Sequence, residues 1–385
     1  MPETSEIKHE QNWYDKYHML LAIIPVILLI VSLVYLGFFY QKNHDFINKD
    51  VSLSGGTTLT LTGTFDEAKL KTELPVKIPD VSFRELSDVG TKKPIAVIIE
   101  SSAEPQKLQE AVESILGYKL DETNSSVEFS GSSLSKDFYS QLLKALLISF
   151  LLMSLVVFIM FGESRLMKII SALLTVAAIS ITFPQITLIR ILMGLIGLVL
   201  IAMAFYSSKS KKEYIYSAIA SLAFIAIYFL NYYFIIFAIT IFLLALYTSL
   251  SIPSIAVIFA AFSDIMIPLA ILDFFGMKIS VAGMAAFLML VGYSVDTDIL
   301  LTTRALKKKE GLLNERIFGA FKTGILMTGT ALAAVLPAFF IVSGLPDSFR
   351  QIFLILALGL GTDILTTWLT NAGIIKWYCK RRNIQ

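Results

Sequence analysis

Long apolar runs and one extended polar segment alternate along the chain, and this pattern predicts its organisation. An apolar run from Leu20 to Phe39 is followed by polar sequence from Gln41 to about Asp137, after which apolar runs dominate. A helix that rises 1.5 Å per residue needs about 20 apolar residues to cross roughly 30 Å of hydrocarbon. The first run is long enough, so the pattern predicts a membrane protein with one water-exposed domain after its first span.

The remainder of the chain predicts nine further membrane spans. Each of these runs has nearly the length needed to cross a bilayer. They occupy residues 142–161, 167–183, 188–206, 214–230, 232–248, 254–274, 280–302, 322–342 and 350–375. The predicted fold is therefore a polytopic α-helical membrane protein with about ten spans.

The polar segment 41–137 predicts a small α+β domain. Period-two alternation indicates strands, whereas apolar residues three and four positions apart indicate helices. Strand, helix, strand, strand, helix and strand are predicted at residues 57–63, 65–74, 81–86, 94–101, 103–117 and 125–131, in that order. This order is typical of a ferredoxin-like fold.

Composition and charge narrow the function classes and set the expected sidedness. The chain is 56% hydrophobic and 16% charged, which excludes a soluble globular protein. Its net charge of +2 gives no indication that it binds nucleic acid. Lys and Arg cluster in alternate connections, so both termini are expected in the cytoplasm and segment 41–137 outside. The single Cys379, three scattered histidines and the lack of an ATP-binding loop motif predict no metal, cofactor or enzymatic activity.

The candidate functional residues are charged side chains within the apolar runs. Such groups are costly in hydrocarbon and are usually buried against protein and used. They are Asp264, Asp296, Asp298, Asp363 and Lys322, with Arg304 a turn and a half beyond Asp298. Because like-charged carboxylates in a poorly solvated site favour proton uptake, these residues are candidates for proton coupling.

Their positions along the helices give further expectations. Asp264 and Asp363 are predicted near the bilayer midplane, and Asp296 and Asp298 closer to the cytoplasm. Asp296 and Asp298 lie about 200° apart around a helix and so cannot share one face. Lys322 is the expected partner of one of them, and Arg304 is expected either to pair with Asp298 or to reach the interface. The alternative is that all these groups only fix the bundle through hydrogen bonds or ion pairs.

Several motifs resemble one protein family. The segments are SLSGGTTLTL at 52–61, PSIAVIFAAFSDI at 253–265, GYSVDTDILLTTR at 292–304 and ERIFGAFKTGILMTGTALAAVLPAF at 315–339. Together they resemble the archaeal form of the SecF family. The resemblance implies an RND-related fold with six spans, an outer domain after the first span, and assistance of protein export together with SecD.

The resemblance also bears on the charged residues. It implies a proton-linked carboxylate at Asp296 or Asp298, because the aspartate of the bacterial motif aligns with Thr297 between them. Lys322 stands near a basic residue of the family's fifth helix, where lysine in place of arginine loses the planar guanidinium fork. Which aspartate carries the role, and whether the coupling ion is a proton or sodium, stay open at this point.

One large segment departs from the family pattern. Residues 164–250 hold four apolar runs where the family has a short loop, and an even number of added spans preserves the sidedness of the later spans. The predicted division is a tail at 1–19, spans at 20–40 and 138–163 around domain 41–137, the insertion 164–250, a SecF-like core at 251–376 and a basic tail at 377–385. We expect the insertion to be a packing element that faces lipid or a partner.

The resulting prediction is an accessory subunit of the Sec translocase in the cytoplasmic membrane. Its expected partners are SecD, the SecY/SecE channel, the translocating polypeptide and membrane lipid. Two alternatives remain: an RND-like carrier of a lipid or other hydrophobic solute, and a passive structural stabiliser of the translocase.

Overall fold

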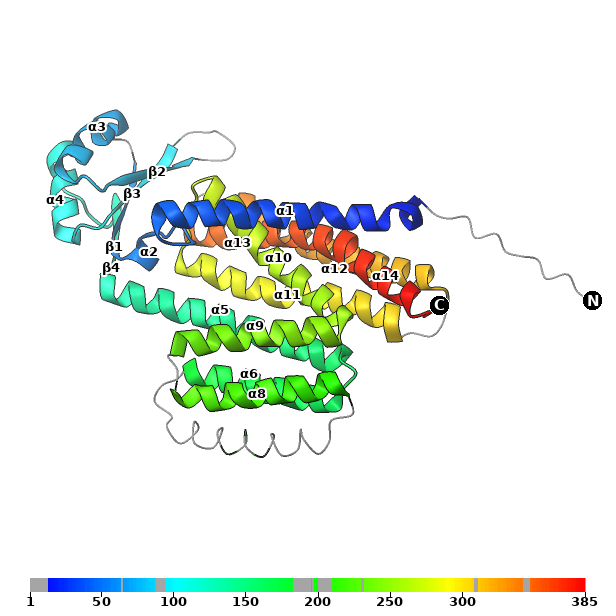
Figure 1. The fold of residues 1–385 in the computed structure, drawn as a ribbon. Coiled ribbons are helices and arrows are strands. Elements are labelled where there is room, and N and C mark those ends of the chain that lie inside the picture. The colour runs from blue at the N-terminus through cyan, green and yellow to red at the C-terminus, as the bar shows by residue number, and fades with distance from the viewer. Residues whose placement is uncertain are drawn as a thin grey trace, which may run out of the picture.

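The fold is a long bundle of helices with a small α+β domain at one end (Figure 1). The computed structural model describes residues 13–63, 65–87, 94–182, 195, 197, 199, 210–229, 232–307, 311–341 and 347–384. The domain follows the first helix in the chain, as the alternation of apolar and polar sequence predicts.

Within the described residues, six helices are long and apolar enough to cross a membrane. Five of them are α1 (Trp13–Asn43), α5 (Ser132–Phe161), α10 (Ile252–Phe274), α11 (Val281–Lys307) and α12 (Leu313–Ile341). The sixth consists of α13 (Asp347–Leu365), the π-helix η2 (Thr366–Asn371) and α14 (Ala372–Arg381). The four further spans predicted within 164–250 lie partly outside the described residues, so the count of ten stays a prediction.

The described part of the insertion packs along one side of this bundle. It comprises α6 (Arg165–Thr182), α8 (Lys211–Phe229) and α9 (Tyr232–Leu250); α6 packs on α5, and α8 and α9 pack on α6 (Figure 1). The buried hydroxyls of Ser171 and Tyr247 share a hydrogen bond of 2.6 Å, and the Tyr247 ring lies 4.5 Å from that of Phe158 in α5. The insertion is therefore continuous with the apolar core of the bundle.

The α+β domain has one antiparallel sheet with two helices on one face. Its elements are β1 (Gly56–Thr62), α3 (Glu67–Lys77), β2 (Ser82–Ser87), β3 (Pro94–Ser101), α4 (Pro105–Leu116) and β4 (Ser125–Ser130), after the short α2 (Val51–Ser54). The strands lie in the order β2-β3-β1-β4, and each neighbouring pair is antiparallel. Leu59 and Ile99 on the helix-facing side are buried against Leu70 of α3 and Leu108 of α4, so the alternation along the strands sets which face is covered.

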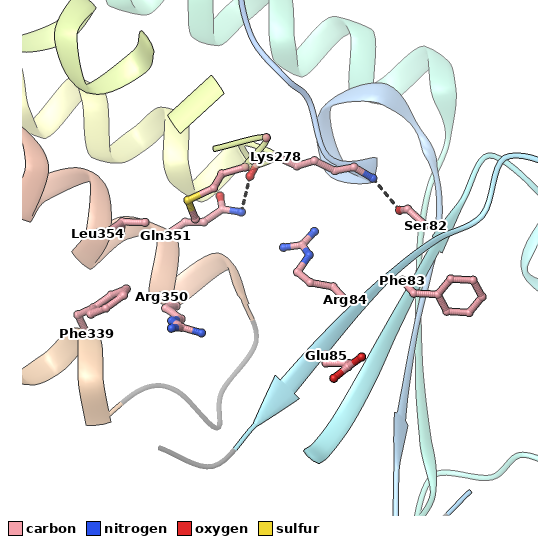
Figure 2. A pocket seen from close by; sticks show the side chains of 11 residues that line it. Ser82, Phe83, Arg84, Glu85, Lys278, Phe339, Arg350, Gln351 and Leu354 are labelled. Carbon is pink, nitrogen blue, oxygen red and sulfur yellow. Dashed lines mark hydrogen bonds between the residues drawn. The ribbon is translucent and has the colours of Figure 1, made fainter. Parts of the chain in front are cut away.

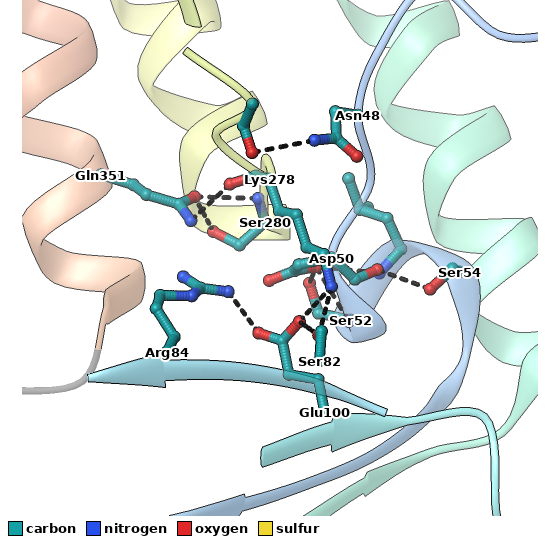
Figure 3. A network of polar contacts seen from close by, with 12 residues as sticks. Asn48, Asp50, Ser52, Ser54, Ser82, Arg84, Glu100, Lys278, Ser280 and Gln351 are labelled. Atoms are coloured by element: carbon teal, nitrogen blue, oxygen red, sulfur yellow. Dashed lines mark hydrogen bonds and ion pairs between the residues drawn. The ribbon is translucent and has the colours of Figure 1, made fainter. Parts of the chain in front are cut away.

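A buried carboxylate joins the α+β domain to the helical bundle (Figure 3). Glu100 of β3 is 6% exposed and accepts hydrogen bonds from Arg84 of β2 and from Lys278 in the connection between α10 and α11. The Lys278 ammonium lies 2.7 Å from Glu100 Oε2 and 2.7 Å from Ser82 Oγ. We call these four residues the domain junction.

The same connection is also tied to α13. Gln351 Oε1 accepts hydrogen bonds from the Ser280 amide (2.9 Å) and hydroxyl (2.7 Å), and its Nε2 donates to the Lys278 carbonyl at 2.7 Å (Figure 3). Gln351 is 7% exposed, so these bonds form away from competing water. The α+β domain is thereby linked through one loop to the helix that carries Asp363.

Candidate functional site

Three helices bring three aspartates together inside the bundle. Asp264 of α10, Asp298 of α11 and Asp363 of α13 are each 0% exposed. Each offers one carboxylate oxygen to a group whose atoms all lie within 4.8 Å of one another. We call these three residues the carboxylate cluster.

Hydroxyl groups supply most of the hydrogen bonds to Asp264 and Asp363. Asp264 accepts from Ser294 of α11 and from Thr366 of η2, the latter at 2.6 Å. Asp363 accepts from Thr297 Oγ1, which lies 2.9 Å and 3.1 Å from its two oxygens. Helix α11 thus carries Asp298 and also two hydroxyl donors. Ser294 donates to Asp264 of α10, and Thr297 donates to Asp363 of α13.

The π-helix η2 places its polar side chains on the cluster. Thr367 Oγ1 lies 2.9 Å from Asp298 Oδ1, and Asn371 Nδ2 donates to the same oxygen at 2.7 Å. Thr366 of the same element reaches Asp264. π-Helical segments are rare and occur often at functional sites, because they rotate side chains that an α-helix would direct elsewhere.

The Thr367 hydroxyl lies between two carboxylates of the cluster. Its oxygen lies 2.9 Å from both Asp298 Oδ1 and Asp363 Oδ1. A hydroxyl has one hydrogen to donate, so it can serve only one ionised carboxylate. The second contact is a hydrogen bond only when that carboxyl group is protonated and donates to the threonine oxygen.

Two further buried oxygens point to the same chemistry. Asp298 Oδ2 and Asn371 Oδ1 have no hydrogen-bond partner among the described residues. Nor does any lysine or arginine in the described ranges form an ion pair with the cluster. Three buried carboxylates without a positive partner are stable only with bound protons or a cation, and carboxylate and amide oxygens are ligands for hard cations.

The other predicted site residues lie outside the cluster. Asp296 is exposed on the opposite side of α11 from Asp298, in agreement with their angular separation. Lys322 is exposed on α12 and, within the described chain, pairs with neither aspartate. Arg304 donates instead to the Gly319 carbonyl (2.7 Å) and to Thr323 Oγ1 (3.0 Å). The expected pairing of Lys322 with an aspartate was wrong, and of the two expectations for Arg304 the pairing with Asp298 does not occur.

Asp298 was expected closer to the cytoplasm than Asp264 and Asp363, yet its carboxylate lies beside theirs, with one oxygen of each within 4.8 Å of the others. The depth of the three residues in the membrane stays a prediction.

Sequence reasoning missed the neutral residues of the site. These are Ser294, Thr366, Thr367 and Asn371, together with Thr297, which was noted only as the position aligned with the bacterial aspartate. A signal was present, because Ser294 precedes Asp298 by four positions, and Thr366 and Thr367 follow Asp363 by three and four. Residues at these spacings lie on the same face of a helix.

Close packing behind η2 allows a test of how rigidly the site is held. A Cβ atom added to Gly324 of α12 would lie 2.3 Å from Cζ2 of Trp368 in η2, whereas one added to Gly329 of the same helix would meet nothing within 4 Å. We expect Gly324→Ala to lower the free energy of unfolding by about 1 to 3 kcal/mol, because Trp368 must move. Gly329→Ala should leave it unchanged or raise it, because alanine favours helix.

Thermal unfolding of both glycine variants in the same detergent or nanodisc measures this difference. Equal unfolding temperatures for Gly324→Ala and Gly329→Ala would contradict a tight contact between α12 and η2.

Part of the chain is similar to known protein-export membrane proteins. Residues 208–381 match the family model described as "Protein export membrane protein SecD/SecF, C-terminal". The "Protein-export membrane protein SecF" of Methanolacinia petrolearia is 51% identical over 131 residues, which cover 34% of this chain and 46% of that protein. The SecF of Methanothermobacter thermautotrophicus is 48% identical over 135 residues, which cover 34% and 47%.

A solved structure shares the fold. The crystal structure of SecDF, a translocon-associated membrane protein from Thermus, has a TM-score of 0.50 and 13% sequence identity. The alignment covers 94% of this chain and 38% of the SecDF chain. At this identity the likeness concerns the fold alone.

The helical bundle, its single α+β domain and the buried carboxylates define a multi-pass membrane protein with ionisable groups in its interior. Part of the chain, residues 208–381, is similar to the C-terminal part of SecD/SecF protein-export membrane proteins, and the chain is similar to archaeal SecF. The chain spans about half the length of the two curated relatives, 46% and 47%.

Proposed function

We propose that this chain is an accessory subunit of the Sec translocase that acts with SecD and couples protein export to a proton gradient. The family supports the export role, and the carboxylate cluster supports the coupling. The single observation that supports the coupling is the position of the Thr367 hydroxyl between Asp298 and Asp363, where a proton on one carboxyl group would complete both hydrogen bonds.

In the proposed cycle, loss of this proton creates repulsion between two carboxylates. When the proton leaves, Asp298 and Asp363 are both ionised at close range in a poorly solvated site, and their repulsion favours separation of α11 from α13. Return of a proton restores the hydrogen bond and the packed arrangement. The conformational equilibrium of the bundle then depends on which side of the membrane supplies the proton.

The α13 helix is the proposed link to the α+β domain. Asp363 and Gln351 are twelve positions apart on one helix, about 18 Å at 1.5 Å per residue. Gln351 holds the loop that carries Lys278, and Lys278 binds Glu100 of the sheet. A shift of α13 would therefore move the domain junction, and we propose that the domain in turn acts on emerging polypeptide or on the partner's outer domain.

The finer architecture belongs to the same proposal. The element order and the sheet order β2-β3-β1-β4 support a ferredoxin-like domain. The distribution of Lys and Arg supports an extracytoplasmic position for it, cytoplasmic termini and ten spans in all. The SecY/SecE channel and the translocating polypeptide are the proposed partners besides SecD.

Reconstituted export tests the proposed function. Proteoliposomes containing the Sec channel and a SecD partner are prepared with and without this chain, and export of a preprotein is measured under an imposed proton gradient. We expect the chain to increase export only while the gradient is present, and an uncoupler to remove the increase. An increase that survives the uncoupler would identify a passive stabiliser, and an increase that follows a sodium gradient would replace the proton by sodium.

A further inference from the structure

A cavity of about 510 Å³ lies where the α+β domain meets the bundle (Figure 2). Its wall on the domain side is β2, and its other walls are the connection between α10 and α11 and the adjoining ends of α12 and α13. It is separate from the carboxylate cluster, with which it shares no residue.

Three cationic side chains line this cavity. Arg84 projects from β2, Arg350 from the first turns of α13 and Lys278 from the connection between α10 and α11 (Figure 2). Among the described lining residues the one anionic side chain is Glu85, which already pairs with Lys71 of α3. The cavity therefore has an excess of positive charge.

Arg350 is the cation that the described chain does not neutralise. Glu100 accepts from both Arg84 and Lys278 at the domain junction. Among the described residues Arg350 forms no ion pair, and its guanidinium stacks 4.9 Å from the centre of the Phe339 ring. Stacking on an aromatic ring fixes a guanidinium while leaving its N–H groups available for an anion.

The other side of the cavity is apolar and lies next to exposed apolar side chains at the end of α12. Met277, Phe339 and Leu354 form this apolar part of the lining. Immediately beside it, at the end of α12, Phe340 is 57% exposed and Ile341 80% exposed. Exposed apolar side chains at the end of a membrane-spanning helix are suited to contact with lipid chains.

We propose that this cavity binds the phosphate of an anionic lipid headgroup, with Arg350 as its principal contact. Arginine recognises phosphate through paired N–H···O bonds. The apolar wall would contact the part of the lipid's hydrocarbon chains that is nearest the glycerol. Basic pockets at helix ends that face the membrane surface bind such headgroups. The bound lipid would bridge β2 and α13. Lipid binding at this site does not depend on whether the chain acts in export.

Lipid titration of the full chain in detergent tests the site. Native mass spectrometry follows binding of phosphatidylglycerol, of zwitterionic phosphatidylcholine and, by competition, of inorganic phosphate. The test variant is Arg350→Gln, and the matched control is Lys107→Gln, which removes one positive charge from an exposed position on α4. Arg350→Lys retains the charge without the planar fork.

We expect Arg350→Gln to weaken phosphatidylglycerol binding about tenfold, the equivalent of one charge-assisted contact of about 1.4 kcal/mol. Arg350→Lys should fall between Gln and the native residue, while Lys107→Gln should bind as the native chain does. Phosphatidylcholine should bind more weakly than phosphatidylglycerol to the native chain.

Three outcomes would overturn the proposal. The first is equal binding of phosphatidylglycerol by Arg350→Gln and the native chain, and the second is equal binding of the two lipids by the native chain. The third is displacement of phosphatidylglycerol by millimolar inorganic phosphate, with phosphate binding that depends on Arg350 in the same way. The last result would identify a site for free phosphate. An unchanged unfolding temperature of Arg350→Gln shows that any lost binding reflects the removed side chain.

Discussion

Asp298→Asn is expected to abolish the gradient-stimulated part of export while leaving the protein assembled in the membrane. Asparagine has nearly the same shape as aspartate and can keep hydrogen bonds to Thr367 and Asn371, but it cannot take up and release a proton. Export that proceeds without a gradient should be unaffected. The measurement is preprotein export in proteoliposomes with and without the imposed gradient.

Asp296→Asn is the matched control for this experiment. Asp296 undergoes the same chemical change two positions away on α11, but it is exposed and outside the carboxylate cluster. We expect it to retain gradient-stimulated export, with equal membrane abundance and equal recovery of the partner for both variants. If Asp298→Asn kept its response to the gradient, the cluster would be a structural feature and the coupling proposal would fail.

Glu100→Gln is expected to loosen the domain junction without unfolding the sheet. The substitution removes the negative charge that Arg84 and Lys278 both contact, on a side chain that is 6% exposed. Removing one partner from a fully buried ion pair costs about 3 to 5 kcal/mol. Because each cation is roughly one-third exposed, we expect about 2 kcal/mol here, which corresponds to about 30-fold more frequent opening.

Two backbone amides report this opening directly. The Ile279 amide donates to the Asn48 carbonyl at 2.6 Å, and the Asp50 amide donates to the Ile279 carbonyl at 3.1 Å. Their hydrogen exchange should accelerate about 30-fold in Glu100→Gln, whereas amides within β1 and β3 should keep their protection. Burial raises the pKa of Asp50 above its usual value, and the hydrogen bond from Ser52 only partly offsets this rise. Because the charge of Asp50 therefore depends on pH, hydrogen exchange in the native chain and in Glu100→Gln should be measured at the same pH.

Glu128→Gln provides the control for the junction. Glu100 and Glu128 flank Thr58 on either side in the sheet, but Glu128 is exposed on β4. The control should leave exchange at Asp50 and Ile279 unchanged. Equal exchange in the two variants would mean that the backbone bonds, rather than the ion pairs, hold the domain in place.

Much of the site's chemistry was visible in the sequence because ionisable groups stand out in apolar runs. Asp264, Asp298 and Asp363 were all candidates, and all three meet in the structure. Lys322 was an equally prominent candidate, yet it is exposed on α12. Rarity within an apolar run identifies an unusual residue, but it does not say which neighbouring helix the side chain faces.

Local pattern was sufficient for the α+β domain and for the opposed directions of Asp296 and Asp298. The strand and helix order of residues 56–130 follows from alternation and helical spacing, which act over a few residues. The angular separation of Asp296 and Asp298 follows from helix geometry alone. Both predictions concern a single element or its immediate neighbours.

Tertiary structure alone decided which polar groups act together. The sequence determined the apolar spans, the single polar domain and the presence of buried carboxylates, because each is written in local composition and periodicity. The contacts of Asp264 with Thr366, 102 positions away, and of Lys278 with Glu100, 178 positions away, depend on helix tilt, offset and the π-helical turn. These are set by packing between elements distant in the chain, which no local pattern records.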